Sequence, residues 1–413
     1  MFLRTNDKME CCGCKVCAEI CPSHCISFQE DKEHFLYPVI DSTKCMECKL
    51  CEKVCPIKNE SVRKQENIEV WAGKFLSEEV LFHSSSGGAF TAIYKTLLNK
   101  EYAIFGVRWA EQYKVIHDVA KNETLCENFR KSKYVLSDTN HCFSKVSEML
   151  LRNEKVCFTG TPCQCTALLS FLKAKRVNCD NLMVIDIICH GAPNQYIFDR
   201  YISEKVNDST KEYQFRFKNK IPYCGKVNSR TASLTDIEGN TEVLTARNDP
   251  FLRGYYGRLF YRPYCSMCEF ASPERVSDIT IGDAWHIENV YSDWNSLEGV
   301  SLLLINSEKG NKLLKEIQNN NMMLLRKMDI DWAVKNNAQL REPTIMNPKR
   351  DKFFELLECN QFEDAVNRSM ASPIYKKILR KIKHYFLGGG RTNSQYKCQI
   401  ECIYNDNGKC ILK

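Results

Sequence analysis

Eight cysteines in two identically spaced runs constrain this 413-residue chain more than any other feature. Each run follows the pattern C-x2-C-x2-C-x3-C-P, and the second begins 34 residues after the first. The first run holds Cys11, Cys14, Cys17 and Cys21, and the second holds Cys45, Cys48, Cys51 and Cys55. Three thiolates spaced two residues apart on a tight loop can converge on three corners of one Fe4S4 cube.

In two-cluster bacterial ferredoxins, which share this pattern, the fourth cysteine of each run ligates the other cluster. We therefore expect one 4Fe-4S cluster on Cys11, Cys14, Cys17 and Cys55, and a second on Cys45, Cys48, Cys51 and Cys21. Paired C-x2-C sequences also form zinc sites, so zinc is the alternative interpretation. Residues 26–28 and 35–39 alternate apolar and polar side chains around a polar turn, which predicts a β-hairpin between the runs.

Length and composition indicate an intracellular globular protein. A chain of 413 residues with 44% hydrophobic content can build two or three domains. We see no signal peptide at the N-terminus and no apolar run near the ~18 residues of a membrane span, so we expect a cytoplasmic protein with reduced cysteines. The net charge of +7 comes from residues 370–413, and the balanced remainder argues against nucleic-acid binding.

After the cysteine runs, the sequence predicts a strand over residues 70–75 and a helix over 89–98, joined by a loop that contains Ser85, Ser86, Gly87 and Gly88. Such a loop exposes backbone N–H groups at a helix N-terminus, where an anion such as a nucleotide phosphate is favoured. An ordinary helix cap is the alternative interpretation. The chain has no G-x-G-x-x-G, so the fingerprint of a nicotinamide-binding Rossmann fold is absent.

Further alternating elements predict a mostly parallel sheet covered by helices. We expect strands over residues 102–109, 155–158 and 182–188, a helix over 142–153, and a further helix that follows the segment 159–165 and continues through Lys173. Cys163 and Cys189 follow two of these strands, and Cys265 and Cys268 form one more C-x2-C pair. These four thiols could hold a third 4Fe-4S cluster, although buried packing thiols or half of a zinc knuckle are the alternatives. His190 is a candidate proton donor or a loop histidine bonded to backbone.

The C-terminal part is expected to be helical. A strand over residues 300–306 precedes helices over 309–319 and 351–367. Isoleucines at 374, 378 and 382 recur among lysines and arginines, which predicts a basic amphipathic helix. It could contact an anionic membrane surface or dock on the protein's own core. Cys398, Cys402 and Cys410 have no spacing that indicates a site.

Several motifs, taken in order, resemble the coenzyme F-420 hydrogenase/dehydrogenase β-subunit family. They are the Ser-Gly-Gly loop, Ser132-Lys133-Tyr134, Gly160-Thr161-Pro162-Cys163-Gln164, Cys189-His190-Gly191, the segment Arg262–Ala271 and the segment Ser277–Asp283. The resemblance extends from the first cysteine to about residue 305. Where family members read Gly-Asp-Phe-Trp-Gly, this chain has Ala284 and His286 around Trp285, which weakens any inference about deazaflavin recognition.

The resemblance implies an FAD-containing iron-sulfur oxidoreductase. In such a protein, one-electron transfer through 4Fe-4S clusters is coupled to two-electron (hydride) chemistry at FAD on a deazaflavin or an organic substrate. The implied cofactor-binding residues are Ser85, Ser86, Gly87, Gly88, Lys133, Tyr134, Gly160 and Thr161. The resemblance also makes a third cluster the favoured role of the four later cysteines. Bacterial members often accompany polysaccharide-biosynthesis genes, so a glycan precursor is one candidate substrate.

We accordingly expect an α/β protein (α+β overall) that begins with a two-cluster ferredoxin module. The expected divisions are residues 1–60 for that module, 68–155 for the flavin phosphate loop, 156–305 for flavin and third cluster, 306–370 for a helical extension and 371–413 for a basic tail. The implied partners are a ferredoxin-like or deazaflavin electron carrier and a small-molecule substrate. The alternative function is an electron-transfer subunit that docks onto another oxidoreductase and has no substrate of its own.

Overall fold

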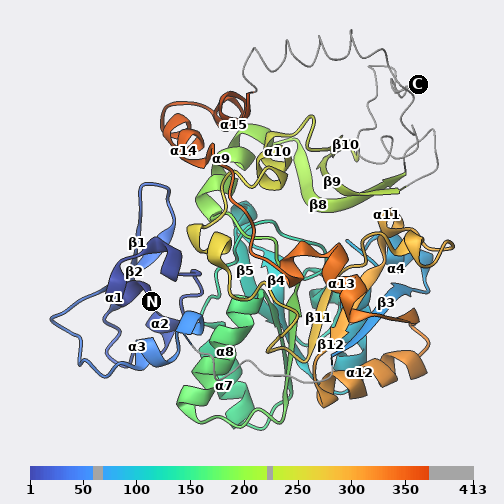
Figure 1. Ribbon diagram of the computed structural model, residues 1–413, viewed down its shortest axis with the longest axis horizontal. Helices are drawn as coiled ribbons and strands as arrows, with labels where there is room; N and C mark the ends of the chain where they lie inside the picture. The colour runs from blue at the N-terminus through green and yellow to red at the C-terminus, as the bar shows by residue number, and fades with distance from the viewer. Residues whose placement is uncertain (59–67, 221–226, 372–413) are drawn as a thin grey trace.

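An eight-stranded sheet forms the centre of the computed structural model, which describes residues 1–58, 68–220 and 227–371 (Figure 1). In spatial order its strands are β13 (Met323–Met328), β3 (Glu69–Phe75), β12 (Ser301–Ile305), β11 (Ile279–Asp283), β7 (Leu182–Ile187), β6 (Val156–Gly160), β4 (Ala103–Trp109) and β5 (Val115–Ala120). β4, β6, β7 and β11 pair in parallel, and β3 runs in the same direction because two antiparallel pairings separate it from β11. Five of the eight strands therefore point the same way, which confirms the predicted fold class.

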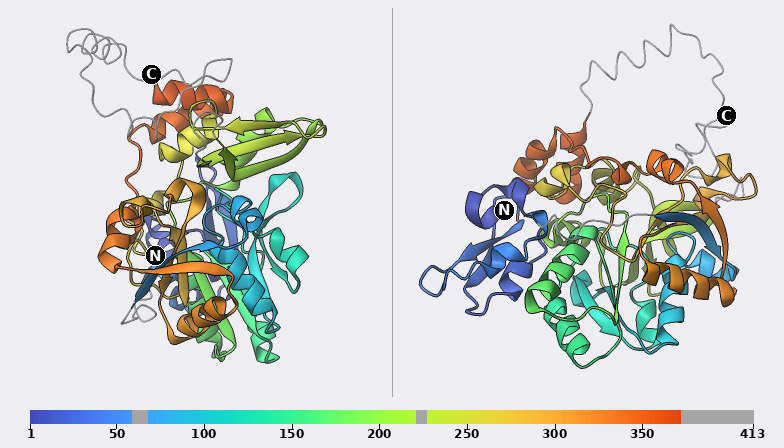
Figure 2. Two further views of the ribbon diagram at one scale, coloured as in Figure 1. Left: turned by 90° about the vertical axis from the view of Figure 1, so that its right-hand side faces the viewer. Right: turned by 60° about the horizontal axis from the view of Figure 1, so that its bottom comes forward.

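Helices cover both faces of this sheet, because successive strand residues point to opposite sides. Phe105 and Phe158 face α7 (Cys142–Leu151) and α8 (Pro162–Lys175). Ile104 and Cys157 face α5 (Ala89–Leu98) and α12 (Glu308–Asn319). α13 (Ile330–Asn336) packs on β3, so the sheet and its helices form three layers (Figure 2).

The pattern of apolar residues in the sequence predicted the positions of most of these strands and helices. The strands and helices predicted between residues 70 and 319 agree with the structure to within two residues at each end, except that α8 begins at Pro162, inside the segment expected to precede that helix. The structure adds short elements that the sequence reading did not predict, namely α4 (Glu78–Phe82), α6 (Glu123–Glu127) and α11 (Ser296–Gly299). It also adds β5, β11 and β13 to the central sheet.

The N-terminal cysteine runs fold as two matching units. Each forms one turn of helix, α2 (Val16–Glu19) or α3 (Leu50–Lys53), after a lysine with φ near +60°. Between them, β1 (Ile26–Glu30) and β2 (Leu36–Ile40) pair antiparallel with Ile26 opposite Ile40, so the predicted hairpin is confirmed. Two further short elements, α1 (Phe2–Thr5) and the 3-10 helix at Lys8–Glu10, precede them. This part lies on one flank of the sheet, where α2 and α3 contact α8 (Figure 1).

A second sheet was not anticipated. β8 (Thr210–Lys220), β9 (Val227–Asp236) and β10 (Thr241–Leu244) pair antiparallel and pack with α9 (Gln195–Lys205) and α10 (Pro250–Tyr256) around a core rich in aromatic side chains. Phe35 and Tyr37 of the N-terminal hairpin enter the same core. The hairpin is therefore anchored by apolar burial as well as by the cysteine units.

The single helix predicted over residues 351–367 is wrong. The structure has two helices there, α14 (Arg350–Cys359) and α15 (Phe362–Met370). Asn360 and Gln361 are extended between them, and this break lets α15 pack on α9 and α10. The sequence indicated helix over most of this region but not the break, which is set by tertiary packing.

Several expectations concern residues outside the described ranges. They are the basic amphipathic helix predicted near Ile374 and the three cysteines of the tail. Within the described ranges, no helix has the length and apolar character needed to cross a bilayer.

His117 of β5 is fully buried and predicts a pH dependence of stability. Its Nε2–H donates to Thr159 O at 3.0 Å, so Nδ1 accepts from the Ser137 hydroxyl at 3.0 Å, and the ring stacks on Phe158. Burial lowers the pKa of His117 to about 4. Between about pH 4 and 6.5 the unfolded chain binds a proton that the native chain does not, so stability falls as the pH falls through this window.

We expect His117 to cost about 2 kcal/mol of unfolding free energy when the pH falls from 6.5 to 5. Denaturant unfolding of wild type and His117→Gln over this range should show the weaker pH dependence in the variant. His83→Gln, at an exposed histidine, is the control and should behave as wild type. Equal slopes for wild type and His117→Gln would contradict the prediction.

Candidate functional site

A cavity of about 520 Å³ lies at the carboxyl edge of the central sheet. Its walls include the loops that follow β3, β6, β7 and β11. Ligands in α/β proteins bind at this edge, because the loops after parallel strands meet there. Seven of the eight predicted cofactor residues line the cavity, namely Ser85, Ser86, Gly88, Lys133, Tyr134, Gly160 and Thr161.

The two loop glycines have different structural roles. Gly87 is outside the cavity lining, since a Cβ there would lie 2.1 Å from the Gly73 carbonyl oxygen. Its N–H donates to Ser301 Oγ at 2.9 Å, which fastens the loop to β12. Gly88 adopts φ 84° and starts α5, whose first turn lines the cavity. Gly87 thus permits close packing, whereas Gly88 permits the left-handed turn that presents the helix N-terminus to the cavity.

The second sheet supplies two cations that sequence reasoning missed. A bulge in β8 gives Arg216 a φ of 57° and turns it toward the cavity. Its guanidinium donates to both carboxylate oxygens of Asp283 at 2.9 Å and to Ser85 O at 2.7 Å. Lys218 donates to Ser86 O at 2.8 Å. Charged and aromatic residues alternate over 215–218, and this was the available signal for a strand with a cationic face.

Burial and neighbouring charges together shift the pKa values of Asp283 and Lys218. Burial would raise the pKa of Asp283, but Arg216 outweighs it and lowers that pKa overall. Burial lowers the pKa of Lys218 to about 7, and neighbouring Arg216 acts in the same direction. The Arg216–Asp283 pair is therefore charged, while Lys218 is poised to titrate near neutral pH.

The Ser-Lys-Tyr element forms the opposite wall. The Ser132 N–H donates to Ser85 Oγ at 3.1 Å, which joins the two loops. Lys133 Nζ donates to Arg130 O at 2.7 Å and other nearby carbonyls, and burial lowers the pKa of Lys133 to about 7. The Tyr134 ring stacks on Tyr255 at 4.2 Å, and both line the cavity. Lys133 thus stabilises its own loop through hydrogen bonds to backbone carbonyls, while the Tyr134 ring forms an aromatic surface in the cavity wall.

The charge around the cavity favours an anionic ligand. Its lining has five lysines and arginines against one acidic residue; these are Arg130, Lys131, Lys133, Arg216 and Arg258 against Asp283. A helix N-terminus adds positive potential at the same place. Together with the tyrosine rings and Trp285, this lining fits a flavin nucleotide, which combines phosphates with a flat aromatic ring.

Four predicted thiols line a smaller cavity that adjoins the first. Cys163, Cys189, Cys265 and Cys268 all belong to its wall. Seven residues line both cavities and so form the partition between them, namely Thr161, Cys189, His190, Gly191, Ala192, Gln339 and Thr344. Burial raises the pKa of Cys189, Cys265 and Cys268 to about 12, so without a metal they are protonated thiols. Binding of an iron cluster would displace these protons.

Two buried donors in this wall fit an acceptor-rich group among the thiols. Among the described residues, Tyr264 Oη and the Arg275 nitrogens have no hydrogen-bond partner, and Arg275 reaches its counter-ion Asp186 only at 3.8 Å. Both residues are 3% exposed. Buried donors cost stability when unsatisfied. The sulfur atoms of a 4Fe-4S cluster would supply the missing hydrogen-bond acceptors.

The structure also brings together both sets of ferredoxin cysteines. Cys17 interacts electrostatically with Cys11 and Cys55, and Cys14 with Cys17 and Cys55. Cys51 interacts with Cys48 and Cys21, and Cys45 lies near Cys25 beside Cys21. In the described part of the chain, no three His, Cys, Asp or Glu side chains converge tightly enough to bind one metal ion. A cubane spreads its four ligands over separate iron atoms.

Cys12 and Cys25, which are not part of the repeated cysteine spacing, are both 5% exposed. Cys12 has a further property that its sequence position does not reveal. Its thiol lies close to those of Cys14 and Cys163, and it lines the four-thiol cavity. Cys12 therefore lies between one predicted ferredoxin ligand and one predicted third-cluster ligand.

Comparisons with known proteins agree with the motif-based resemblance. Residues 10–59 match the family model of the 4Fe-4S dicluster domain, and residues 153–331 match the model of the C terminus of the coenzyme F420 hydrogenase/dehydrogenase β subunit. Residues 153–331 therefore carry a region of this β-subunit family, and residues 10–59 carry an iron-sulfur domain. The recognition made from the motifs is confirmed.

Individual relatives are distant. The β subunit of F420-dependent formate dehydrogenase from Methanocaldococcus jannaschii is 22% identical over 248 residues, which cover 58% of this chain and 56% of the relative. The chain thus spans about half the length of this curated relative. A chain of the F420-reducing NiFe hydrogenase complex from Methanosarcina barkeri, determined as a xenon derivative, aligns with 14% identity and a TM-score of 0.44 over 80% of this chain and 97% of that one.

From the burial of the Arg216–Asp283 ion pair, we predict a large loss of unfolding free energy when one partner is removed. Asp283→Asn would leave a buried guanidinium without its counter-charge, so we expect a loss of about 3 kcal/mol in unfolding free energy, measured by denaturant titration. The exposed bidentate pair of Arg326 and Asp293 provides the matched control, and Asp293→Asn should cost less than about 1 kcal/mol. Equal losses in the two variants would show that burial does not set the energetics of the pair.

Proposed function

We propose that this protein is an FAD-dependent iron-sulfur oxidoreductase with a third 4Fe-4S cluster. The observation that carries the proposal is the shared wall of two cavities, one suited to a flavin nucleotide and the other lined by four cysteines. Cys189 belongs to both walls. A cluster on the four thiols would therefore adjoin a flavin in the larger cavity, which electron exchange between them requires.

The residues of the larger cavity have separable roles in this proposal. The first turn of α5 and the cations Lys131 and Arg216 would hold the phosphates. Tyr134 and Trp285 would pack against the flat ring. His190 lies in the partition and is our candidate to hold or deliver a proton.

When bound, the clusters supply one-electron transfer and FAD supplies the conversion between one-electron and two-electron chemistry. The protein's contribution is to bury the reacting groups and exclude water. A deazaflavin or another organic molecule is the proposed substrate. The alternative is an electron-transfer subunit without a substrate of its own; a chain that holds clusters but never a flavin would favour it.

One end of the ferredoxin part is suited to an external electron carrier. Cys48 is exposed, and Met46 beside it is 63% exposed. A cluster held there would lie near solvent, where a ferredoxin-like partner could approach. At the opposite end, Cys12 and Cys14 are both buried, and Cys12 lines the four-thiol cavity.

The third cluster predicts a specific iron content. Anaerobically purified protein should contain about twelve irons per chain, and Cys265→Ser should lower this to about eight, because oxygen is a poorer ligand for iron than thiolate. Cys179→Ser changes a partly buried cysteine outside the predicted sets and should leave the iron content unchanged. About eight irons in wild type would remove the third cluster, and zinc without iron would remove all three.

The flavin site predicts loss of FAD when Gly88 is replaced. Gly88→Val would disturb the left-handed turn at the cavity and should lower the FAD-to-protein ratio about tenfold, measured by absorbance after release of the flavin. Gly239→Val is the control, because Gly239 has a similar φ of 90° but lies in an open turn away from the cavity. Unchanged FAD in Gly88→Val would contradict the assigned loop, and a wild type that never binds FAD would contradict the enzyme.

A further inference from the structure

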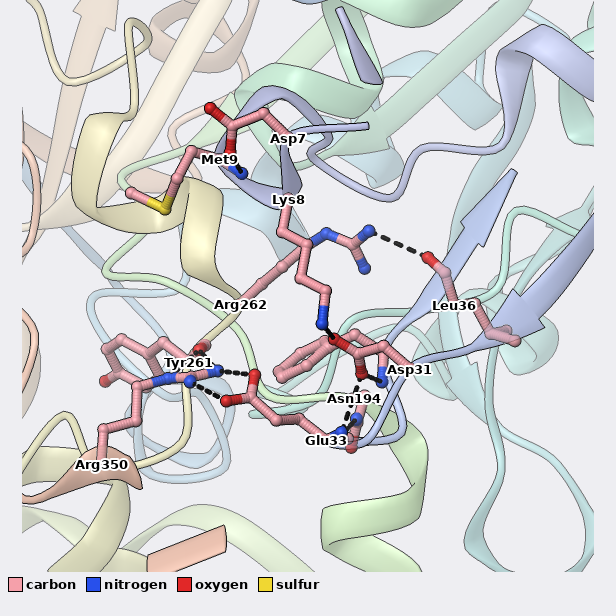
Figure 3. A network of polar contacts seen from close by, with 11 residues as sticks. Asp7, Lys8, Met9, Asp31, Glu33, Leu36, Asn194, Tyr261, Arg262 and Arg350 are labelled. Carbon is pink, nitrogen blue, oxygen red and sulfur yellow. Dashed lines mark hydrogen bonds and ion pairs between the residues drawn. The ribbon is translucent and has the colours of Figure 1, made fainter. Parts of the chain in front are cut away.

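Arg262 lies between the N-terminal hairpin and the four-thiol cavity, and it is 3% exposed. Its backbone N–H donates to Ala192 O at 3.0 Å, and its carbonyl accepts from the Cys265 N–H at 2.9 Å. The side chain crosses to the hairpin and donates to Leu36 O at 2.9 Å (Figure 3). Its guanidinium also lies over the Tyr37 ring at 4.5 Å. Arg262 thus connects the segment of Cys265 to the ferredoxin part.

The same guanidinium contacts a predicted cluster ligand directly. Nη2 lies 3.3 Å from Cys11 Sγ, and Nε donates to Cys11 O at 2.6 Å. A Cβ on Gly13 would lie 2.8 Å from Nη1, so the loop closes tightly around Arg262. Gly13 has φ 79°, a conformation that glycine adopts without strain. The loop geometry therefore keeps the guanidinium close to the Cys11 sulfur.

A second arginine holds the hairpin without touching a cysteine. Arg350 forms a two-pronged ion pair with Glu33, with Nη2 to Oε2 at 2.7 Å, and also donates to Tyr261 O (Figure 3). Both arginines anchor the hairpin, but of the two only Arg262 contacts Cys11. This difference allows anchoring to be separated from any electronic effect on the sulfur.

We propose that Arg262 is a positioning residue that raises the reduction potential of the cluster ligated by Cys11. A hydrogen bond and a buried positive charge at a ligand sulfur stabilise the more negative, reduced state of a cluster. Because Arg262 also lines the four-thiol cavity, it acts at the ferredoxin cluster that faces the interior, not at the one near exposed Cys48. The inference rests on the proposed cluster ligands and on neither flavin nor substrate.

The test is a redox titration of the full-length protein followed by EPR, after iron and flavin have been quantified. Arg262→Gln removes the charge, and Arg262→Lys keeps it but loses the planar fork. The measured quantity is the ratio of reduced to oxidised cluster at the potential where the wild-type cluster is half reduced. In Arg262→Gln this ratio should fall about threefold or more for one of the two magnetically coupled ferredoxin clusters. Arg262→Lys should show a smaller fall in the same cluster.

Arg350→Gln is the matched control, since it loosens the same hairpin without touching Cys11. It should leave both ferredoxin midpoints unchanged. An equal shift in Arg350→Gln, or no shift in Arg262 variants that retain their iron, would overturn the proposal. If both Arg262 variants lose iron while Arg350→Gln keeps it, Arg262 is a structural anchor and the proposal also fails. A wild type that lacks FAD or the third cluster would contradict the proposed function instead, and the ferredoxin pair could still be titrated.

Discussion

Both cavities depend on the parallel pairing of β6, β7 and β11. Gly160 pairs with Asp186, and Ile187 pairs with Ile281, so the three strands end at one edge of the sheet. Because parallel strands expose their following loops on the same side, segments far apart in sequence converge there. This register brings Cys163 and Cys189 into one wall, although they are 26 positions apart in the sequence.

The second sheet completes the cavity with charges that the central sheet could not hold by itself. Taking Arg216 out of water is costly unless it is paired and hydrogen-bonded. Asp283 at the end of β11 and the Ser85 carbonyl provide these partners. The bulge in β8 is what turns Arg216 toward them. A β-bulge placed beside a site re-aims one side chain without changing the rest of the strand.

The sequence allowed prediction of features that depend on local patterns. Cysteine spacing indicated the ferredoxin part, and periodicity located elements such as α5 and β7 closely. The β8–β10 sheet was missed although aromatic and charged residues alternate in β8, because the pairing of its strands is set by tertiary packing. The contact of Arg262 with Cys11 joins positions 251 residues apart, and no local pattern encodes such a contact.

The buried donors near the four thiols connect the stability of this fold to its cofactors. Arg275 and Tyr264 are buried without hydrogen-bond acceptors in the described part of the chain, and the thiols beside them favour the neutral form. Without a bound group, the desolvation of these donors therefore destabilises the folded chain. An anionic cluster would satisfy the donors and take the thiols as thiolates, so its binding free energy would add to the stability of the folded state. The same argument explains why a fold would keep buried, positively charged side chains at positions where packed apolar side chains would be more stable in the absence of a cofactor.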